Sequence, residues 1–397
     1  MVRVTLAQAT QFILAKNFLA EKQAGSLLHL LEALAGLPAE PPLTALLAAQ
    51  QRVVTFRPEM LSQALAQKQV VRAPLVRSTV YLVPALDYPL WLAATVRQRN
   101  QAFNAEFRLW GLATNDPIEQ LAATVLTLLK DQALSQALSL EEIAARLPAA
   151  AVTTLTQTSR GGRVSQTTSL ELALRWLTAQ GKVTLLNSPP DRRQEQHVYA
   201  LFEQVYPEVE VTVLPGEAEA QQAVVRRYLA AFGPASEADI SFWTGFGKSE
   251  TARATNALSR ETTLTMVQGL PGMQLCLKAQ AEALRAAQPS AEPVVSILPA
   301  DDPFVTAHRA SRNRYFNDQT LQRQIFSSSG AAKPTLLIDG QIVGIWRLEA
   351  GQLRWRLLVA VDPAVVSRVE AEVERTAAFL REVGGPQPVT IKKEEME

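Results

Sequence analysis

One order of elements recurs three times along the chain: helices with one apolar face, then a helix stop, then a strand or a pair of strands. The copies cover residues 1–112, 113–215 and 216–290. An apolar residue at every third or fourth position predicts a helix with one buried face, and Gly or Pro directly after it predicts its end. The fold must therefore accommodate three small helical modules, each closed by strands.

The second copy shows this order most clearly. Ser139-Leu140-Glu141-Glu142 matches the Ser-x-x-Glu capping box, so a short helix should begin there. Residues 169–180 are amphipathic, and Gly181 follows where a left-handed residue typically ends a helix. Two strand-like runs come next, separated by the polar loop 187–196. Helix, glycine, strand, loop and strand is the order of a recognition helix and its wing in a winged-helix unit.

The first and third copies keep the order but not the residues. The first has predicted helices between residues 27 and 66, then a strand in VRSTVYLVP, residues 76–84, that leads into a long helix. The third has a helix that ends at Gly233-Pro234 and a hairpin whose turn is Gly269-Leu270-Pro271-Gly272. We therefore predict tandem winged-helix units.

The last region, residues 291–385, changes to a strand pattern. Asp339-Gly340 is a hairpin turn between two apolar runs, and Asp362-Pro363 begins a final helix. Residues 386–397 have no apolar anchor, so we expect a flexible tail. The predicted fold class is α+β, mainly α, with tandem winged-helix units followed by a β-rich C-terminal domain and a terminal helix.

The composition is that of a globular protein, with 47% hydrophobic residues, 19% charged residues and a net charge of +1. A protein that coats DNA non-specifically usually has a large positive excess, so that class is disfavoured, but a local cationic patch is not excluded. Cys276 is the single cysteine, which excludes an intramolecular disulfide and a cysteine metal cage. The three histidines are far apart, so we predict no metal site.

No organic cofactor is predicted, because the sequence has no Gly-x-Gly-x-x-Gly, no P-loop and no Gly-x-Ser-x-Gly. The first residues, MVRVTLAQATQF, lack the apolar core of a signal peptide. No apolar run reaches the ~20 residues that a bilayer crossing needs. We expect a cytoplasmic protein with no membrane partner.

Arginines gather at loops and helix ends, where mobile cations can contact phosphates. Arg160 and Arg163 flank Gly161-Gly162 before the predicted recognition helix, and Arg192 and Arg193 lie in the predicted wing. Both clusters fall where a winged helix contacts DNA. Each arginine could equally be an ordinary solvated side chain. The same two interpretations apply to Arg72, Arg77, Arg97, Arg99, Arg108, Arg309, Arg312 and Arg314.

Glu40 is the carboxylate most restricted by its neighbours, because it lies in Pro38-Ala39-Glu40-Pro41-Pro42 between two predicted helices. Proline fixes the backbone on either side, so the carboxylate should be held in place. The alternative is that Glu40 only complements the dipole of the following helix. Asp301-Asp302, followed by Pro303, predicts a turn rather than a metal site or an acid–base pair.

Four segments together resemble a known bacterial family: VRAPLVRSTVYLVPALDY, AAFGPASEADISFWTG, LPADDPFVTAHRASRNR and LLIDGQIVGIWRLE. They resemble the winged-helix DNA-binding family that includes the helix–loop–turn–helix DNA glycosylases, and the resemblance spans roughly residues 5–380. Members of that family remove bulky N-alkylated purines and unhook interstrand crosslinks. The order and spacing of the four segments make the resemblance specific.

The resemblance places the catalytic turn at Pro38-Ala39-Glu40. The family carries Gln-x-Gln or Gln-x-Asp upstream of a signature arginine, which is Arg77 here. Glu40 matches the second position, whereas Pro38 replaces the first glutamine and has no side-chain donor. Tyr81 stands where histidine is common, and Ser78 stands where glycine is common.

The implied function is that of a monofunctional DNA glycosylase, which hydrolyses the N-glycosidic bond of alkylated or crosslinked purines with Glu40 as general base and electrostatic stabiliser. Hydrolysis needs only water, so no metal or cofactor is implied. The expected partner is double-stranded DNA in the nucleoid of the cytoplasm. A non-catalytic winged-helix DNA-binding or regulatory protein is the alternative. The residues expected to contact DNA are Arg72, Arg77, Ser78, Thr79, Tyr81, Arg160, Arg163, Arg192, Arg193, Arg312 and Arg314.

Overall fold

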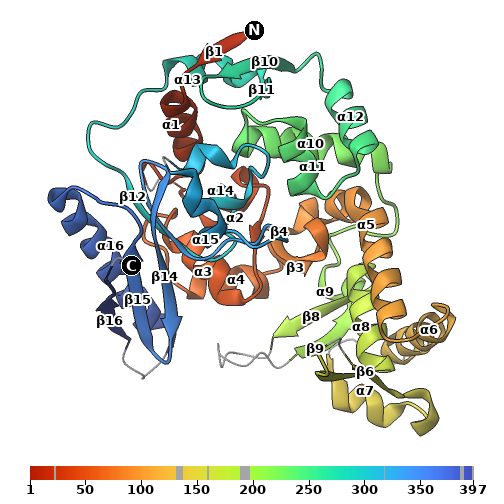
Figure 1. Ribbon diagram of the computed structural model, residues 1–397. Coiled ribbons are helices and arrows are strands. Elements are labelled where there is room, and N and C mark those ends of the chain that lie inside the picture. The colour runs from red at the N-terminus through yellow and green to blue at the C-terminus, as the bar shows by residue number, and fades with distance from the viewer. Residues whose placement is uncertain are drawn as a thin grey trace. The chain divides into compact units, whose positions relative to one another are not determined.

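The computed structural model describes residues 1–21, 24–130, 137–158, 161–187, 197–316, 318–384 and 389–395 (Figure 1). The chain divides into two compact units. Unit 1 comprises Met1–Val70, Tyr81–Pro84 and Gln221–Glu397, and unit 2 comprises Val71–Val80 and Ala85–Ala220. Helices predominate over strands, which confirms the predicted α+β, mainly α class. Each unit draws on more than one of the four predicted regions, so that division stays a prediction.

The first two copies contain the elements from β1 to α9. The first region contains β1 (Val2–Val4), α1 (Leu6–Lys16), α2 (Leu27–Ala33), β2 (Leu37–Pro38), α3 (Pro42–Gln50), α4 (Glu59–Ala66), β3 (Val70–Pro74), β4 (Val80–Pro84) and α5 (Tyr88–Leu109). The second contains α6 (Asp116–Lys130), β5 (Leu138–Ser139), α7 (Leu140–Arg146), β6 (Thr154–Thr158), β7 (Val164–Thr168), α8 (Ser169–Ala179), β8 (Val183–Asn187), β9 (His197–Leu201) and α9 (Phe202–Val205).

The remaining elements belong to unit 1, except for the start of α10. They are α10 (Glu217–Phe232), α11 (Glu237–Thr244), α12 (Lys248–Ala257), β10 (Thr262–Val267), β11 (Gln274–Leu277), α13 (Ala281–Ala286), β12 (Val295–Leu298), α14 (Pro303–Thr306), α15 (Gln322–Ile325), β13 (Thr335–Ile338), β14 (Gln341–Glu349), β15 (Gln352–Leu357), α16 (Pro363–Gly384) and β16 (Thr390–Lys393).

Each copy contains helices followed by strands, as the sequence predicted, and also an early paired segment that the sequence did not predict. In each copy an early segment, which is a short strand in the first two copies and a single residue in the third, pairs antiparallel with the last strand. β2 pairs with β4, β5 pairs with β9, and Ala235 forms a bridge with Leu275 of β11. The second copy carries an addition that the sequence did not predict, the antiparallel hairpin β6–β7 between α7 and α8. Its strands are polar, so they lack the alternation that identifies a half-buried strand.

The core of unit 2 is built around α8, the helix predicted as the recognition helix. A capping box at Thr168 and Glu171 begins this helix, and Gly181 follows it with φ +69°. Its apolar side packs on α6, and Trp176 meets the ring of Phe103 edge-on at 5.3 Å. The predicted end of this helix at Gly181 is therefore confirmed, whereas the capping box at its start was not identified from the sequence.

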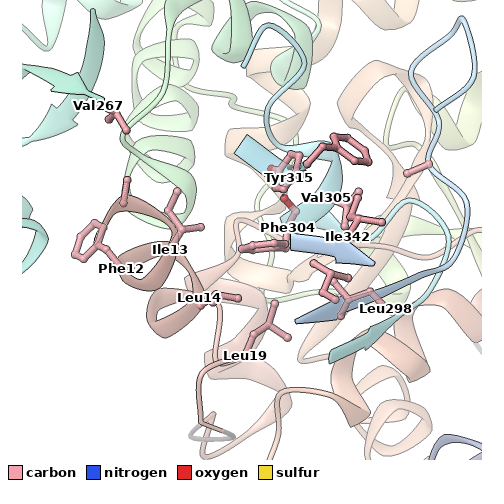
Figure 2. Close-up of a cluster of buried hydrophobic side chains, with 14 of the residues drawn as sticks. Phe12, Ile13, Leu14, Leu19, Val267, Leu298, Phe304, Val305, Tyr315 and Ile342 are labelled. Carbon is pink, nitrogen blue, oxygen red and sulfur yellow. Dashed lines mark hydrogen bonds between the residues drawn. The ribbon is translucent and has the colours of Figure 1, made fainter. Parts of the chain in front are cut away.

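The core of unit 1 joins segments that are far apart in the sequence. Figure 2 shows Phe12, Ile13 and Leu14 of α1 beside apolar side chains of the C-terminal region, including Phe304 and Ile342. The C-terminal sheet has the order β12-β13-β14-β15-β16, and α16 packs against β12. Figure 1 shows α16 alongside the strands of this sheet, in blue. The predicted hairpin turn at Asp339-Gly340 is confirmed, since both residues have positive φ between β13 and β14.

The expectation of a flexible tail over residues 386–397 is wrong for Thr390–Lys393, which form β16. This strand pairs in parallel with β15, and Ile391 lies opposite Leu353. The ammonium group of Lys393 lies 5.0 Å from the centroid of the Trp355 ring. Pairing with β15 satisfies the backbone groups of this polar segment, which has too few apolar side chains to predict its order from the sequence.

A fully buried ion pair links α3 to the segment before α14. Arg52 donates hydrogen bonds to both carboxylate oxygens of Asp302, at 2.8 and 2.6 Å, and the side chains of both residues are 0% exposed. The guanidinium also donates to the carbonyls of Asn17 and Ala48. Asp302 accepts the Phe304 amide and caps α14. The predicted turn at Asp301-Asp302 is present, and the Arg52–Asp302 pair joins the end of α1, the end of α3 and the segment before α14.

The described residues were searched for membrane-spanning helices and for clusters of metal-binding side chains. None of the described helices combines the length and apolar character required to cross a bilayer. Across the same residues, no group of three or more His, Cys, Asp or Glu side chains is arranged to hold a metal ion.

Replacing Asp302 with Asn should lower the free energy of unfolding by about 3–5 kcal/mol, because the Arg52 charge stays buried after its partner is removed. Urea denaturation of the full chain measures this loss. Arg368→Ala serves as the control, since it breaks the exposed ion pair with Glu292 and should change stability by less than about 1 kcal/mol. Equal effects of the two substitutions would contradict the role assigned to the buried pair.

Candidate functional site

The turn that carries Glu40 is fixed by the backbone before it. Gly36 has φ +93°, and a Cβ at this position would lie 2.9 Å from the carbonyl oxygen of Leu82. Only glycine accommodates both the left-handed backbone and the close approach of β4. Pro38 lies opposite Tyr81 in the β2–β4 pair, and Ala39 is 1% exposed. Glu40 therefore leaves a buried, paired strand at a defined position.

The Glu40 side chain is exposed, and no described residue donates a hydrogen bond to its carboxylate or forms an ion pair with it. Helix α3 begins directly after it, at Pro42, and its N-cap residue Pro41 provides no side-chain cap. Pro41 and Pro42 have no N–H, and the Thr44 amide donates to the Pro41 carbonyl. Few donors are left at this helix end to bind an anion, so the geometry does not favour dipole complementation as the reason for a carboxylate at position 40.

Tyr81 lies behind the turn rather than at the surface. It is 6% exposed, and its ring meets Trp243 of α11 edge-on, with the centroids 6.5 Å apart. The ring therefore packs the sheet that presents Glu40. Because the Tyr81 side chain is buried, its position does not support the predicted contact with DNA.

The loop between β3 and β4 carries three predicted DNA contacts in a strained backbone. Arg77 and Ser78 have φ of +52° and +58°, consecutive left-handed conformations that are unusual for residues other than glycine. Gln98 of α5 accepts a hydrogen bond from the Arg77 amide at 3.0 Å, and the Thr79 hydroxyl donates to the Val76 carbonyl at 2.7 Å. The conformation gives a physical reason why glycine is common at position 78 in the family that the sequence resembles.

The predicted DNA contacts are distributed over both units. Arg77 and Thr79 are exposed, whereas Arg72 and Ser78 are half-buried. Arg163 is exposed directly before β7. These five residues belong to unit 2, whereas Glu40, Tyr81, Arg312 and Arg314 belong to unit 1. The predicted contacts Arg160, Arg192 and Arg193 lie outside the described residues.

Arg312 and Arg314 are buried, at 9% and 3% exposure. The guanidinium of Arg312 lies 3.7 Å from the centroid of the Phe326 ring and donates to the Gly330 carbonyl. That of Arg314 donates to the Pro234 carbonyl and to the Ser311 hydroxyl. Both guanidinium groups are engaged inside unit 1, so we assign these residues to support of the loop and not to contact with phosphate.

Asp239 of α11 anchors that loop. Its carboxylate accepts hydrogen bonds from the amides of Ala310 and Ser311, at 2.7 and 3.2 Å, and from the Ser311 hydroxyl at 2.8 Å. Burial alone would raise the pKa of Asp239, but the hydrogen bonds from Ser236 and Ser311 and the charge of Arg314 together lower it. A charged carboxylate thus holds residues 310–311 against α11.

His308 is buried within the same network and is neutral. Burial and the nearby charge of Arg314 hold the pKa of His308 well below its usual value. Arg314 presents an N–H to Nε2 at 3.0 Å, so we assign the ring proton to Nδ1. Nδ1 lies 2.7 Å from the Tyr315 hydroxyl, which donates to the Phe304 carbonyl. Nε2 also lies 3.0 Å from the Phe232 carbonyl, and this contact is not a hydrogen bond in the assigned tautomer.

His308 should remain neutral, with its proton on Nδ1, at pH 6. Its folded pKa is below the unfolded value, so the unfolded chain binds a proton that the native ring does not. Stability is therefore lost as pH falls below ~6.5, by up to about 1.4 kcal/mol per pH unit. Two-dimensional NMR of the imidazole nitrogens, assigned with His308→Gln, measures the protonation. Protonation of native His308 with a midpoint at or above ~6.5 would contradict the assignment.

Comparison with known proteins assigns the chain to a family. The sequence matches the family described as DNA glycosylase AlkZ-like over residues 31–382. No curated protein matches the sequence. Among solved structures, the DNA glycosylase AlkZ of Streptomyces sahachiroi is similar, with a TM-score of 0.76 and 18% identity over 99% of this chain and 100% of that chain. The resemblance to DNA glycosylases is confirmed by the match over most of the sequence, and this chain belongs to the AlkZ-like DNA glycosylase family.

Proposed function

We propose that the protein is a monofunctional DNA glycosylase that hydrolyses the N-glycosidic bond of alkylated or crosslinked purines in double-stranded DNA, with Glu40 as its catalytic carboxylate. One observation carries the assignment of Glu40. Its carboxylate is exposed and has no hydrogen-bond or ion-pair partner among the described residues, while the backbone before it is locked by Gly36 and by the β2–β4 pair. A carboxylate held in this way is available to a substrate.

The chemistry follows from the charge of the lesion. Alkylation at a purine ring nitrogen makes the base cationic, so the glycosidic bond breaks readily and leaves an oxocarbenium-like sugar. The negative charge of Glu40 opposes the positive charge that develops on the sugar. The same carboxylate accepts a proton from the attacking water, and the base leaves as the neutral purine. Water is the only co-reactant.

Pro38 determines which substrates we expect. A glutamine at that position could hydrogen-bond to the water or to the lesion, whereas proline has no side-chain donor or acceptor. With Glu40 acting alone, the enzyme depends on a leaving group that is already activated. We therefore propose cationic N-alkylated purines as its substrate class, and crosslinks that pass through the same ring nitrogen.

We further propose that the three recurring copies are winged-helix units that bind duplex DNA. Their shared order of elements supports this, as does the pairing of the first with the last strand in each copy. The exposed residues Arg77, Thr79 and Arg163 remain proposed DNA contacts, together with the half-buried Arg72 and Ser78. A role in the nucleoid of the cytoplasm follows from this proposal.

The presence of proline at position 38, where the family has glutamine, also favours a second candidate function. In this alternative the chain is a non-catalytic DNA-binding or regulatory protein that keeps the scaffold. In that case the protein binds duplex DNA with a steep salt dependence and releases no base. Incubation with a duplex that carries a 7-alkylguanine, followed by detection of the free base, separates the two functions.

Glu40→Gln should lower the rate of base release by about 10²–10⁴-fold, because the amide neither carries the charge nor accepts the proton. The matched control is Glu32→Gln, an exposed glutamate at the end of the preceding helix α2, which should leave the rate unchanged. Duplex binding should survive both changes. Base release by Glu40→Gln at the wild-type rate would remove Glu40 from the mechanism.

Pro38→Gln should raise base release by about tenfold, the effect of one added hydrogen bond to a charged or reacting group. Single-turnover kinetics on the same 7-alkylguanine duplex measure the gain. Because Pro38 lies in a buried strand, thermal unfolding of the variant must show first that β2 is intact. A folded variant with no gain in rate would mean that the first glutamine position has no catalytic role in this protein.

A further inference from the structure

Arg309 differs from the two other arginines of its segment because it is exposed. Its guanidinium lies 4.8 Å from the centroid of the Phe242 ring of α11. It forms no ion pair with any described carboxylate. Residues 303–316 and 319–338 contain no Asp or Glu. The charged residues within these two segments are therefore all basic, whereas the Asp301 carboxylate accepts a hydrogen bond from the Ala332 amide next to the turn.

The backbone on both sides of Arg309 is anchored. His308 is buried in the network with Arg314, and the amide of Ala310 donates to Asp239. The loop that presents Arg309 is therefore held by buried hydrogen bonds. A cation on such a loop loses less conformational entropy on binding than one on a flexible loop.

The Phe242 ring is also held in place. Gly330 has φ +98°, and a Cβ there would lie 2.6 Å from the Cζ atom of Phe242. The glycine lets the turn 327–331 close directly against the ring. Cation–π contact with this fixed ring restricts the positions that the guanidinium can take.

The same turn contributes exposed hydroxyls beside Arg309. The guanidinium donates to the Ser328 carbonyl at a long 3.4 Å. The hydroxyls of Ser327 and Ser329 bond to each other at 2.8 Å, and no described group bonds to the hydroxyl of Ser328. An oriented guanidinium and a hydroxyl thus project from one small surface, with no carboxylate in the two segments that build it.

We propose that Arg309 and Ser328, backed by the ring of Phe242, form a phosphate-binding subsite for the DNA backbone. The planar guanidinium matches two phosphate oxygens, and the hydroxyl can donate to a third. This subsite rests on the proposed function, and it assigns to Arg309 the phosphate contact that Arg312 and Arg314 cannot make from their buried positions. Such a contact sets the register of the duplex on unit 1 and carries no sequence preference.

Fluorescence anisotropy with an undamaged duplex over a series of NaCl concentrations tests the subsite in the full chain. Arg309→Ala should weaken binding by about 3- to 10-fold and reduce the slope of log affinity against log salt by about one. Arg309→Lys should keep the slope but lose part of the affinity, because an ammonium group cannot make the bidentate contact. Phe242→Leu should lose affinity with the slope kept, since the charge remains but is no longer oriented.

Arg368→Ala is the matched control, because Arg368 is an exposed arginine of unit 1 that is already paired with Glu292. It should leave both affinity and slope unchanged. Wild-type affinity and slope in Arg309→Ala, or an equal loss in Arg368→Ala, would overturn the subsite, as would a wild-type chain that does not bind duplex. Because binding is measured without catalysis, a failure of base release would refute the glycosylase and leave these results intact.

Discussion

The pair between Arg52 and Asp302 is the interaction on which the arrangement of unit 1 depends. Two buried charges are strongly unfavourable unless their hydrogen bonds are satisfied, and here the guanidinium reaches two carboxylate oxygens and two backbone carbonyls. Arg52 follows α3, the helix that begins directly after Glu40. The ion pair thus holds the far end of α3, while Gly36 and the β2–β4 pair hold the turn before its near end.

A second buried polar network has a comparable role around α11. Asp239 accepts hydrogen bonds from the backbone of the loop that follows α14, and Arg314 donates to the His308 ring and to the Pro234 carbonyl. Such a network favours one conformation, because any shift leaves a buried charge or donor without its partner. The exposed Arg309 is therefore carried by a loop that buried hydrogen bonds hold in position. The same hydrogen bonds that satisfy the buried charges of Asp239 and Arg314 also hold the backbone on both sides of Arg309.

Local signals predicted the elements that depend on local interactions. The capping box at Ser139 and the left-handed Gly181 gave the limits of two helices, and Asp339-Gly340 gave a hairpin. The β6–β7 hairpin and β16 were not predicted, because polar strands lack a hydrophobic alternation. The burial of Arg314 could not be predicted either, since Pro234 lies 80 residues away in the sequence. The position of Glu40 came from its prolines and from the family resemblance, whereas its accessibility required the structure.

Strand β16 completes the C-terminal sheet by covering the edge of β15. An uncovered strand edge is a template for another chain, because its amides and carbonyls lack partners. A shortened protein that ends before Thr390 would present that edge to its own copies and would tend to self-associate. An expressed version of the protein should therefore keep this strand, and an affinity tag placed after it needs a spacer long enough to leave the edge closed.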